Sequence, residues 1–214
     1  MNDVQGLPVI VVHGLWVHGL VMEYLAHQLK QNGFDAHTWS YPTMRQSLTE
    51  NAEHLAQYCE SLGIKRLNIV AHSMGGLVAM KMLECSPVIQ CERLLLLGTP
   101  YTDSAAARRL AQFPGGDWLL GRSIREWLDE KRPCLQARQA GVIAGTRGIG
   151  LGALIGAVLP QPHDGVVAVE ETAVPGITEH IAVHVGHTEM LFSSEVARQC
   201  CAFLRQGFFA REKT

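Results

Sequence analysis

The sequence lacks any concentration of positive charge. Its formal net charge is −2, and no run of lysines or arginines stands out. A nucleic-acid-binding surface needs a positive patch that neutralises phosphates, so the sequence predicts no nucleic-acid partner. The same shortage argues against a polybasic segment that would hold the protein on a membrane.

Long hydrophobic runs are also missing. The longest apolar stretch spans residues 149–159 and is rich in glycine, which makes it too short to cross a bilayer. Residues 1–8 include Asp3 and contain no basic region followed by an apolar run, so we do not expect a signal peptide there. We therefore expect no stable membrane anchor.

The cysteines lack the C-x-x-C spacing that would indicate a metal site or a redox pair. Several fall within apolar helical or strand patterns, and Cys200 and Cys201 are adjacent, an awkward geometry for a bridge between them. We therefore predict free, buried thiols in a reducing compartment, and hence a soluble cytoplasmic protein. The six cysteines are Cys59, Cys85, Cys91, Cys134, Cys200 and Cys201.

What is present is a regular alternation of strands and amphipathic helices. Hydrophobic residues make up 47% of the 214 residues and charged residues 18%, which suits one folded domain spanning residues 1–214. Because each connection between parallel strands requires a crossover, the alternation predicts an α/β fold with a mostly parallel sheet of about six strands flanked by helices. We expect strands at 9–12, 36–41, 67–71, 94–97, 141–144 and 181–185, and helices near 20–29, 47–62, 74–85 and 195–205.

One segment interrupts this alternation. Residues 101–133 have helical character, contain no strand pattern, and include Trp118, Ile124 and Trp127 among their apolar residues. The segment is either a small helical cap over an active site or a helix pair that covers the domain, and the sequence leaves both possibilities open.

The segment most informative about function is residues 69–76, Ile-Val-Ala-His-Ser-Met-Gly-Gly. An apolar strand leads into Ser73, small residues surround it, and a helix follows. This arrangement resembles the G-x-S-x-G nucleophile elbow of the α/β-hydrolase fold, in the A-x-S-x-G variant of small bacterial lipases and esterases. The resemblance implies that Ser73 is a catalytic nucleophile, although a serine in this place is also a common helix N-cap. We expect His72 to be a packing or loop-positioning residue.

The loop after the first strand reads His13-Gly14-Leu15-Trp16 and resembles the H-G-x motif of the same family. Backbone N–H groups stabilise the oxyanion in acyl transfer, and the resemblance implies that Leu15 and Met74 donate them. Met74 also begins a helix, whose free N–H groups favour an anion. Trp16 is a candidate substrate-binding residue.

Two later motifs follow the family's order of serine, acid and histidine. Asp164, in His-Asp-Gly-Val-Val, resembles the acid, and His187, in Gly-His-Thr, resembles the base. The alternative base is His184, which we expect to be packed in a strand or to face the surface. Asp103 follows the fourth strand, where some divergent members carry the acid, and the other acidic alternatives are Asp117, Asp129 and Glu189.

Two further features could indicate a metal site and a phosphate site, and we favour neither interpretation. His163 neighbours Asp164, but no further ligand lies at metal-binding spacing around it, so we predict no metal. The glycine-rich residues 145–152 match no phosphate-binding motif, and we expect a flexible apolar loop that lines an acyl site.

The resemblance extends from Val9 to about Leu204. It implies a serine hydrolase that cleaves carboxylic esters, carboxylesterase-like or lipase-like, through a Ser73–His187–Asp164 triad and a covalent acyl-enzyme, without a cofactor. Apolar residues near the site predict a small-molecule ester with an apolar group. A thioesterase, an acyltransferase or a lyase on the same scaffold, and a non-catalytic interaction protein, remain alternatives.

Overall fold

A computed structural model of the chain describes residues 6–150, 152 and 156–211. The remaining residues of the predicted domain, which are 1–5, 151, 153–155 and 212–214, lie outside the described residues. Six parallel strands form one sheet in the order β2-β1-β3-β4-β5-β6, so the predicted fold class is confirmed. The strands are β1 (Val9–Val12), β2 (Ala36–Trp39), β3 (Arg66–His72), β4 (Gln90–Leu97), β5 (Gln139–Gly145) and β6 (Glu179–Val183).

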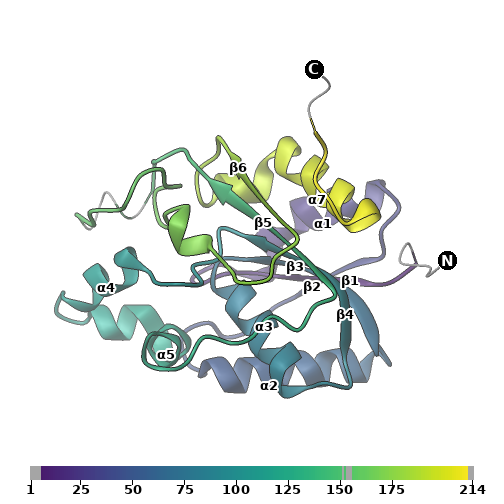
Figure 1. Cartoon of the computed structure of the whole chain (residues 1–214). Helices are drawn as coiled ribbons and strands as arrows, with labels where there is room; N and C mark the ends of the chain where they lie inside the picture. The colour runs from purple at the N-terminus through teal and green to yellow at the C-terminus, as the bar shows by residue number, and fades with distance from the viewer. Residues whose placement is uncertain (1–5, 151, 153–155, 212–214) are drawn as a thin grey trace.

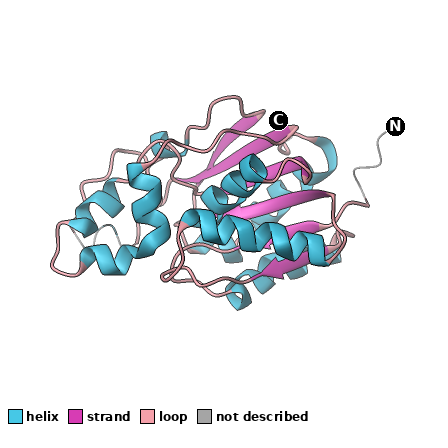
Figure 2. Cartoon of the chain, turned by 90° about the horizontal axis from the view of Figure 1, so that it is seen from below, coloured by secondary structure: helices cyan, strands magenta, loops and turns pink. Residues whose placement is uncertain are grey.

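Helices cover both faces of the sheet (Figures 1 and 2). Successive strand side chains point to opposite faces, so Val9 and Val11 pack with α1 and α7, whereas Ile10 and Val12 pack with α2 and α3. All four valine and isoleucine side chains are fully buried, as continuous apolar strands require. The helices are α1 (Glu23–Gln31), α2 (Leu48–Ser61), α3 (Met74–Cys85) and α7 (Ser194–Gln206).

Local sequence signals explain where these helices begin and end. Ser47 and Glu50 form a capping box at the start of α2, with the Ser47 hydroxyl accepting from the Glu50 N–H at 3.1 Å. Gly207 ends α7 in the left-handed conformation that favours glycine. The first helix, predicted near 20–29, begins only at Glu23, because Leu20 lies in a short 3-10 turn, η1 (Gly19–Met22), and is 75% exposed.

The last strand begins and ends earlier than predicted. We expected residues 181–185, whereas β6 spans Glu179–Val183. β6 lies at one edge of the sheet and has no fully buried position, so a run of apolar residues does not mark its ends. Val185 is buried, but it belongs to the loop that follows the strand.

The segment 101–133 is helical, as predicted. It contains α4 (Ala105–Ala111) and α5 (Gly116–Asp129), which extend beyond the sheet at one end of the molecule (Figure 1). Gly121, with φ at +70°, interrupts the helical conformation inside α5. Leu110, Leu120 and Trp127 join the core on the α2–α3 side of the sheet.

The six cysteines, all within the described part of the chain, are free. Four are buried as predicted, but Cys85 and Cys134 are exposed because they lie at the end of α3 and in the loop after α5.

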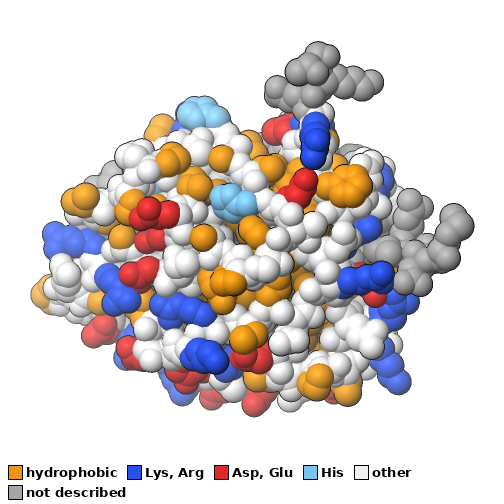
Figure 3. Space-filling view, in the orientation of Figure 1, with side chains coloured by type: hydrophobic (Ala, Val, Ile, Leu, Met, Phe, Trp, Pro, Cys, Tyr) orange, Lys and Arg blue, Asp and Glu red, His pale blue; other side chains and the backbone are white. Residues whose placement is uncertain are grey.

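None of the helices in the described ranges is long and apolar enough to span a bilayer. On the face drawn in Figure 3, basic and acidic side chains alternate, and neither sign forms a large patch.

Candidate functional site

Ser73 occupies a sharp turn between β3 and α3. Its φ of +54° and ψ of −128° lie outside the regions that residues with a side chain normally adopt. The turn is held by the Ser73 N–H, which donates to the Leu97 carbonyl at 2.9 Å, and by the Thr99 hydroxyl, which donates to the Ser73 carbonyl at 3.0 Å. The surroundings therefore fix a conformation that the residue alone does not favour.

The small residues after Ser73 are required by close contacts. A Cβ atom on Gly75 would collide with the carbonyl oxygens of Val12 and His13, and one on Gly76 would collide with the Thr99 side chain. A Cβ atom on Gly14 would come within 2.8 Å of the Ser73 Cβ. Glycine at these positions thus allows the loop after β1 to lie directly against the serine.

Asp164 and His187 form a buried hydrogen-bonded pair. The His187 Nδ1 lies 2.7 Å from an Asp164 carboxylate oxygen, and the His187 N–H donates to the Asp164 carbonyl at 2.9 Å. The other carboxylate oxygen accepts from the N–H groups of Val166 at 2.9 Å and Val167 at 2.7 Å. Burial raises the pKa of Asp164, but the neighbouring His187 and these hydrogen bonds outweigh burial and hold the pKa below its usual range.

The alternatives for the acid and the base have other partners. Asp103 binds Arg108 at 2.7 Å, and Glu189 binds Arg147 at 2.9 Å. His184 lies on the surface, with its Nδ1 3.4 Å from the Thr146 hydroxyl. Within the described residues, Asp164 is the carboxylate that contacts His187.

A cavity of about 680 Å³ joins these elements. Ser73, His187, Leu15, Trp16 and Met74 all line it, so the predicted residues from three separate loops lie around one space. Asp164 lies behind His187 and is 1% exposed. The remaining wall is largely apolar and includes Ala106, Ala107, Leu110, Leu119, Leu120 and Ile124 of α4 and α5, and Ile149, Val166 and Val167 of two loops.

Helices α4 and α5 of the 101–133 segment contribute residues to the cavity wall. Four residues of the glycine-rich loop, Arg147, Ile149, Gly150 and Gly152, also line the cavity.

The loop after β1 is held by contacts between His13 and Tyr41 that the sequence did not reveal. The His13 Nε2 accepts from the Tyr41 N–H at 3.2 Å, and the Tyr41 hydroxyl donates to the His13 carbonyl at 2.8 Å. The two rings stack with their centroids 4.5 Å apart. Burial lowers the pKa of His13, so this ring stays neutral and keeps its acceptor for Tyr41. These contacts fix the backbone just before Leu15.

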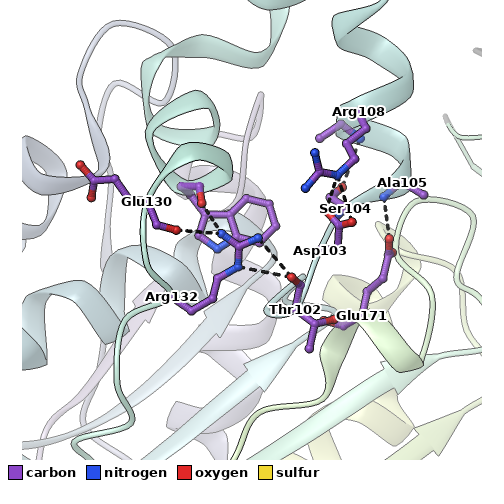
Figure 4. Close-up of polar contacts among 10 residues, drawn as sticks. Thr102, Asp103, Ser104, Ala105, Arg108, Glu130, Arg132 and Glu171 are labelled. Atoms are coloured by element: carbon purple, nitrogen blue, oxygen red, sulfur yellow. Dashed lines mark hydrogen bonds and ion pairs between the residues drawn. The ribbon is translucent and has the colours of Figure 1, made fainter.

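Two polar residues, Glu171 and Arg132, hold the ends of the segment that carries α4 and α5 (Figure 4). The Glu171 carboxylate, in the 3-10 turn η2 (Glu170–Thr172), accepts from the N–H of Ala105 at 2.6 Å and from that of Ala168 at 2.8 Å. Arg132 donates to the Thr102 carbonyl at 3.1 Å and to the Glu130 carbonyl at 3.2 Å. Arg132 thereby joins the chain entering the two helices to the chain leaving them.

No group of three or more His, Cys, Asp or Glu side chains among the described residues could hold a metal ion. His163, the candidate ligand in the sequence, instead accepts a hydrogen bond from the Gly165 N–H at 3.0 Å.

The sequence of the chain matches an established family. The model of the alpha/beta hydrolase family matches residues 9–204, and the chain belongs to that family. No match was found among curated protein sequences.

Solved structures of esterases and lipases share the fold. Lipase BlEst2 from Bacillus licheniformis in its mature form is 20% identical, with a TM-score of 0.69, and the match covers 98% of this chain and 95% of that one. In its propeptide form the TM-score is 0.75 at 20% identity, and this chain, covered completely, spans 53% of that longer chain. Carboxylesterase CesB from Bacillus subtilis gives a TM-score of 0.61 at 15% identity, covering 97% and 85%.

Proposed function

We propose that this protein hydrolyses carboxylic esters, with Ser73 as nucleophile, His187 as general base and Asp164 as the acid that orients the base. The observation that carries the proposal is the buried Asp164–His187 hydrogen bond of 2.7 Å beside a cavity that Ser73 also lines. A carboxylate on Nδ1 keeps the proton there and leaves Nε2 free to accept the serine proton. That tautomer is the one a general base requires.

The reaction would proceed in two steps through a covalent intermediate. Ser73 attacks the ester carbonyl as its proton passes to His187, and His187 returns that proton to the departing alcohol. Water then attacks the resulting acyl-serine with His187 again as base, which releases the carboxylic acid and restores the enzyme. This sequence needs no cofactor.

The oxyanion would be held by the backbone N–H groups of Leu15 and Met74. Met74 is the first residue of α3, so its N–H has no acceptor within the helix and lies at the positive end of the helix dipole. Leu15 follows Gly14, which packs against Ser73. Both residues line the cavity beside the serine.

The cavity favours an ester with an apolar group. Ester cleavage is also consistent with the similar structures, which are named a lipase and a carboxylesterase. Apolar side chains from α4, α5 and the glycine-rich loop enclose it, and burial of an apolar acyl or alcohol group there is favourable. We propose that α4 and α5 act as a small cap over the site, and that Trp16 contacts the substrate. Trp16 also donates from its indole N–H to the Leu119 carbonyl at 2.9 Å, which connects the loop after β1 to α5.

The proposal is tested by initial rates on p-nitrophenyl esters of increasing chain length, with thioester and amide substrates for comparison. We expect esters to be the best substrates and S73A to lower kcat by about 10⁴-fold or more. The matched control is S86A, at the opposite end of α3, which should keep the wild-type rate. A folded S73A variant with the wild-type rate, or a wild-type protein that cleaves none of the esters, would rule the proposal out.

A further inference from the structure

One buried titratable side chain at the site has no role in the reaction described above. His72, the last residue of β3, is 2% exposed, and its Nε2 lies 3.0 Å from the His187 carbonyl oxygen. Because a carbonyl oxygen only accepts hydrogen bonds, Nε2 must carry the proton and donate. The Nδ1 is then unprotonated, and it has no hydrogen-bond partner among the described residues.

The ring of His72 also packs against the ring of His187. Their centroids are 4.6 Å apart, with the planes inclined by 47°. Burial, followed by the charge of the neighbouring His187, lowers the pKa of His72 to about 3. His72 therefore remains neutral when His187 accepts a proton, and no second positive charge opposes that step.

His72 and Asp164 connect His187 to different parts of the domain. The hydrogen bonds of His187 within the described residues go to Asp164, through Nδ1 and the backbone N–H, and to His72, through the carbonyl. Asp164 attaches the histidine to the acid loop, whereas His72 attaches it to the strand that carries Ser73. On its other side, the His72 Nδ1 faces Gly14, where an added Cβ would lie 3.1 Å away.

We propose that His72 is a positioning residue that holds the His187 loop in register with Ser73, through the Nε2–H donated to the His187 carbonyl and the packing of the two rings. The inference rests on the proposed function, since it assumes that His187 is the base. It adds that the geometry between base and nucleophile depends on a residue that takes no part in the proton transfer.

Two amide substitutions separate the hydrogen bond from general packing. In H72Q the amide nitrogen can take the place of Nε2 and donate to the His187 carbonyl, whereas in H72N the shorter amide reaches only the place of Nδ1. H72F keeps a ring without any donor. The control is N68L, a buried position on the same strand that makes no side-chain hydrogen bond among the described residues.

The measurements are kcat and KM on one p-nitrophenyl ester, the melting temperature, and the NMR signal of the His187 Nδ1 proton. A misplaced base costs kcat more than binding, so we expect H72N and H72F to lose about 10- to 100-fold in kcat with KM nearly unchanged, and H72Q to recover most of that loss. The Nδ1 proton signal should persist in H72Q and broaden in H72N, and N68L should resemble wild type in both measurements.

Wild-type kcat in H72N, equal losses in H72Q and H72N, or failure of both amide variants to fold would overturn the inference. The NMR comparison tests the role of His72 separately from the proposed esterase activity. An inactive wild-type protein would contradict esterase activity, whereas an unchanged Nδ1 signal in H72N would contradict the role of His72.

Discussion

Ser73 lies in a turn that exposes its hydroxyl, but the backbone conformation of this turn is unfavourable for any residue with a side chain. Its φ of +54° is matched among the described non-glycine residues only by Trp16, at +58°, which also lines the cavity. Strain of this kind costs on the order of 1–3 kcal/mol and persists where the surrounding structure enforces it. Both exceptions therefore lie at the site, where function would justify the cost.

We predict from this strain that S73G is more stable than S73A. Glycine adopts the conformation without a steric penalty, and this gain exceeds its greater unfolded-state entropy, for a net difference of about 1 kcal/mol. Urea unfolding of the two inactive variants measures the difference directly. Equal stabilities would mean that the turn at Ser73 is not strained.

Asp164 leads to a prediction about tautomers. In D164N, the amide oxygen should stay with the N–H groups of Val166 and Val167, so the amide nitrogen would face His187 and donate to its Nδ1. The imidazole would then carry its proton on Nε2 and could not accept one from Ser73, which should lower kcat by about 10³- to 10⁴-fold.

Kinetics at constant fold, checked by circular dichroism, measure the effect of D164N. D103N is the matched control, because Asp103 binds Arg108 at the surface, and it should retain activity. Full activity in D164N, or a loss in D103N as large, would contradict the assignment of the acid.

At the scale of elements, Arg132 joins the two ends of the α4–α5 segment, and Glu126 of α5 accepts from Leu48 and Thr49 at the start of α2. Arg132 donates to the backbone carbonyls of Thr102 and Glu130, and its guanidinium lies 4.3 Å from the centroid of the Trp127 ring. The two helices form part of the cavity wall, so the position of that wall depends on these contacts.

We predict that R132M loosens the two helices. The lost hydrogen bonds and ring contact should reduce the free energy of unfolding by about 1–3 kcal/mol, and KM should rise more for long-chain than for short-chain esters. R108M, which removes an ion pair about half exposed, should cost under about 1 kcal/mol and leave KM unchanged. An R132M protein with wild-type stability and wild-type KM values would show that Arg132 does not hold this segment.

Sequence patterns predicted the central elements well, for identifiable reasons. β1, β3, β4 and β5 carry buried apolar runs, and α2 has a complete capping box, so local chemistry marks where they lie. β2 is only partly buried and ends at Trp39 instead of the predicted Tyr41, and β4 begins at Gln90, four residues before the predicted Leu94. The edge strand β6 lacks buried positions, and its boundaries were wrong by two residues for that reason. The helical nature of α4 and α5 was predicted, whereas their place in the cavity wall depends on long-range contacts such as that between Arg132 and Thr102.

At the scale of the whole molecule, the site residues are brought together by the parallel sheet. Ser73 follows β3, Asp164 follows β5, and His187 follows β6, so all three lie beyond the carboxyl ends of their strands. That convergence could be inferred from the order of motifs. The supporting contacts could not, because nothing in the sequence indicates that Tyr41 would hold His13, or that Glu171 would connect Ala105 to Ala168.

The buried histidines give the whole molecule a predictable response to acid. The pKa of His72 falls from its ordinary value of 6.5 to about 3 on folding, so below pH 6.5 the unfolded chain binds a proton that the folded one does not. Stability should therefore be fully present above pH 6.5 and decrease as the pH falls from 6.5 toward 3, with buried His13 contributing in the same direction.

Thermal unfolding between pH 7 and pH 5 measures this response, and H72Q should show a smaller decrease than wild type. Asp164, whose pKa is held low, loses its contribution to stability only in more acidic solution, so it does not affect the comparison. A wild-type stability that does not change across this range would contradict the burial of neutral histidines.

The most direct test of the central claim is peptide mass spectrometry after reaction of the folded wild-type protein with a fluorophosphonate. The account predicts one phosphonyl group, attached to Ser73, and no labelling of the H187A variant. No adduct on the folded wild-type protein, or an adduct on a different residue, would contradict it.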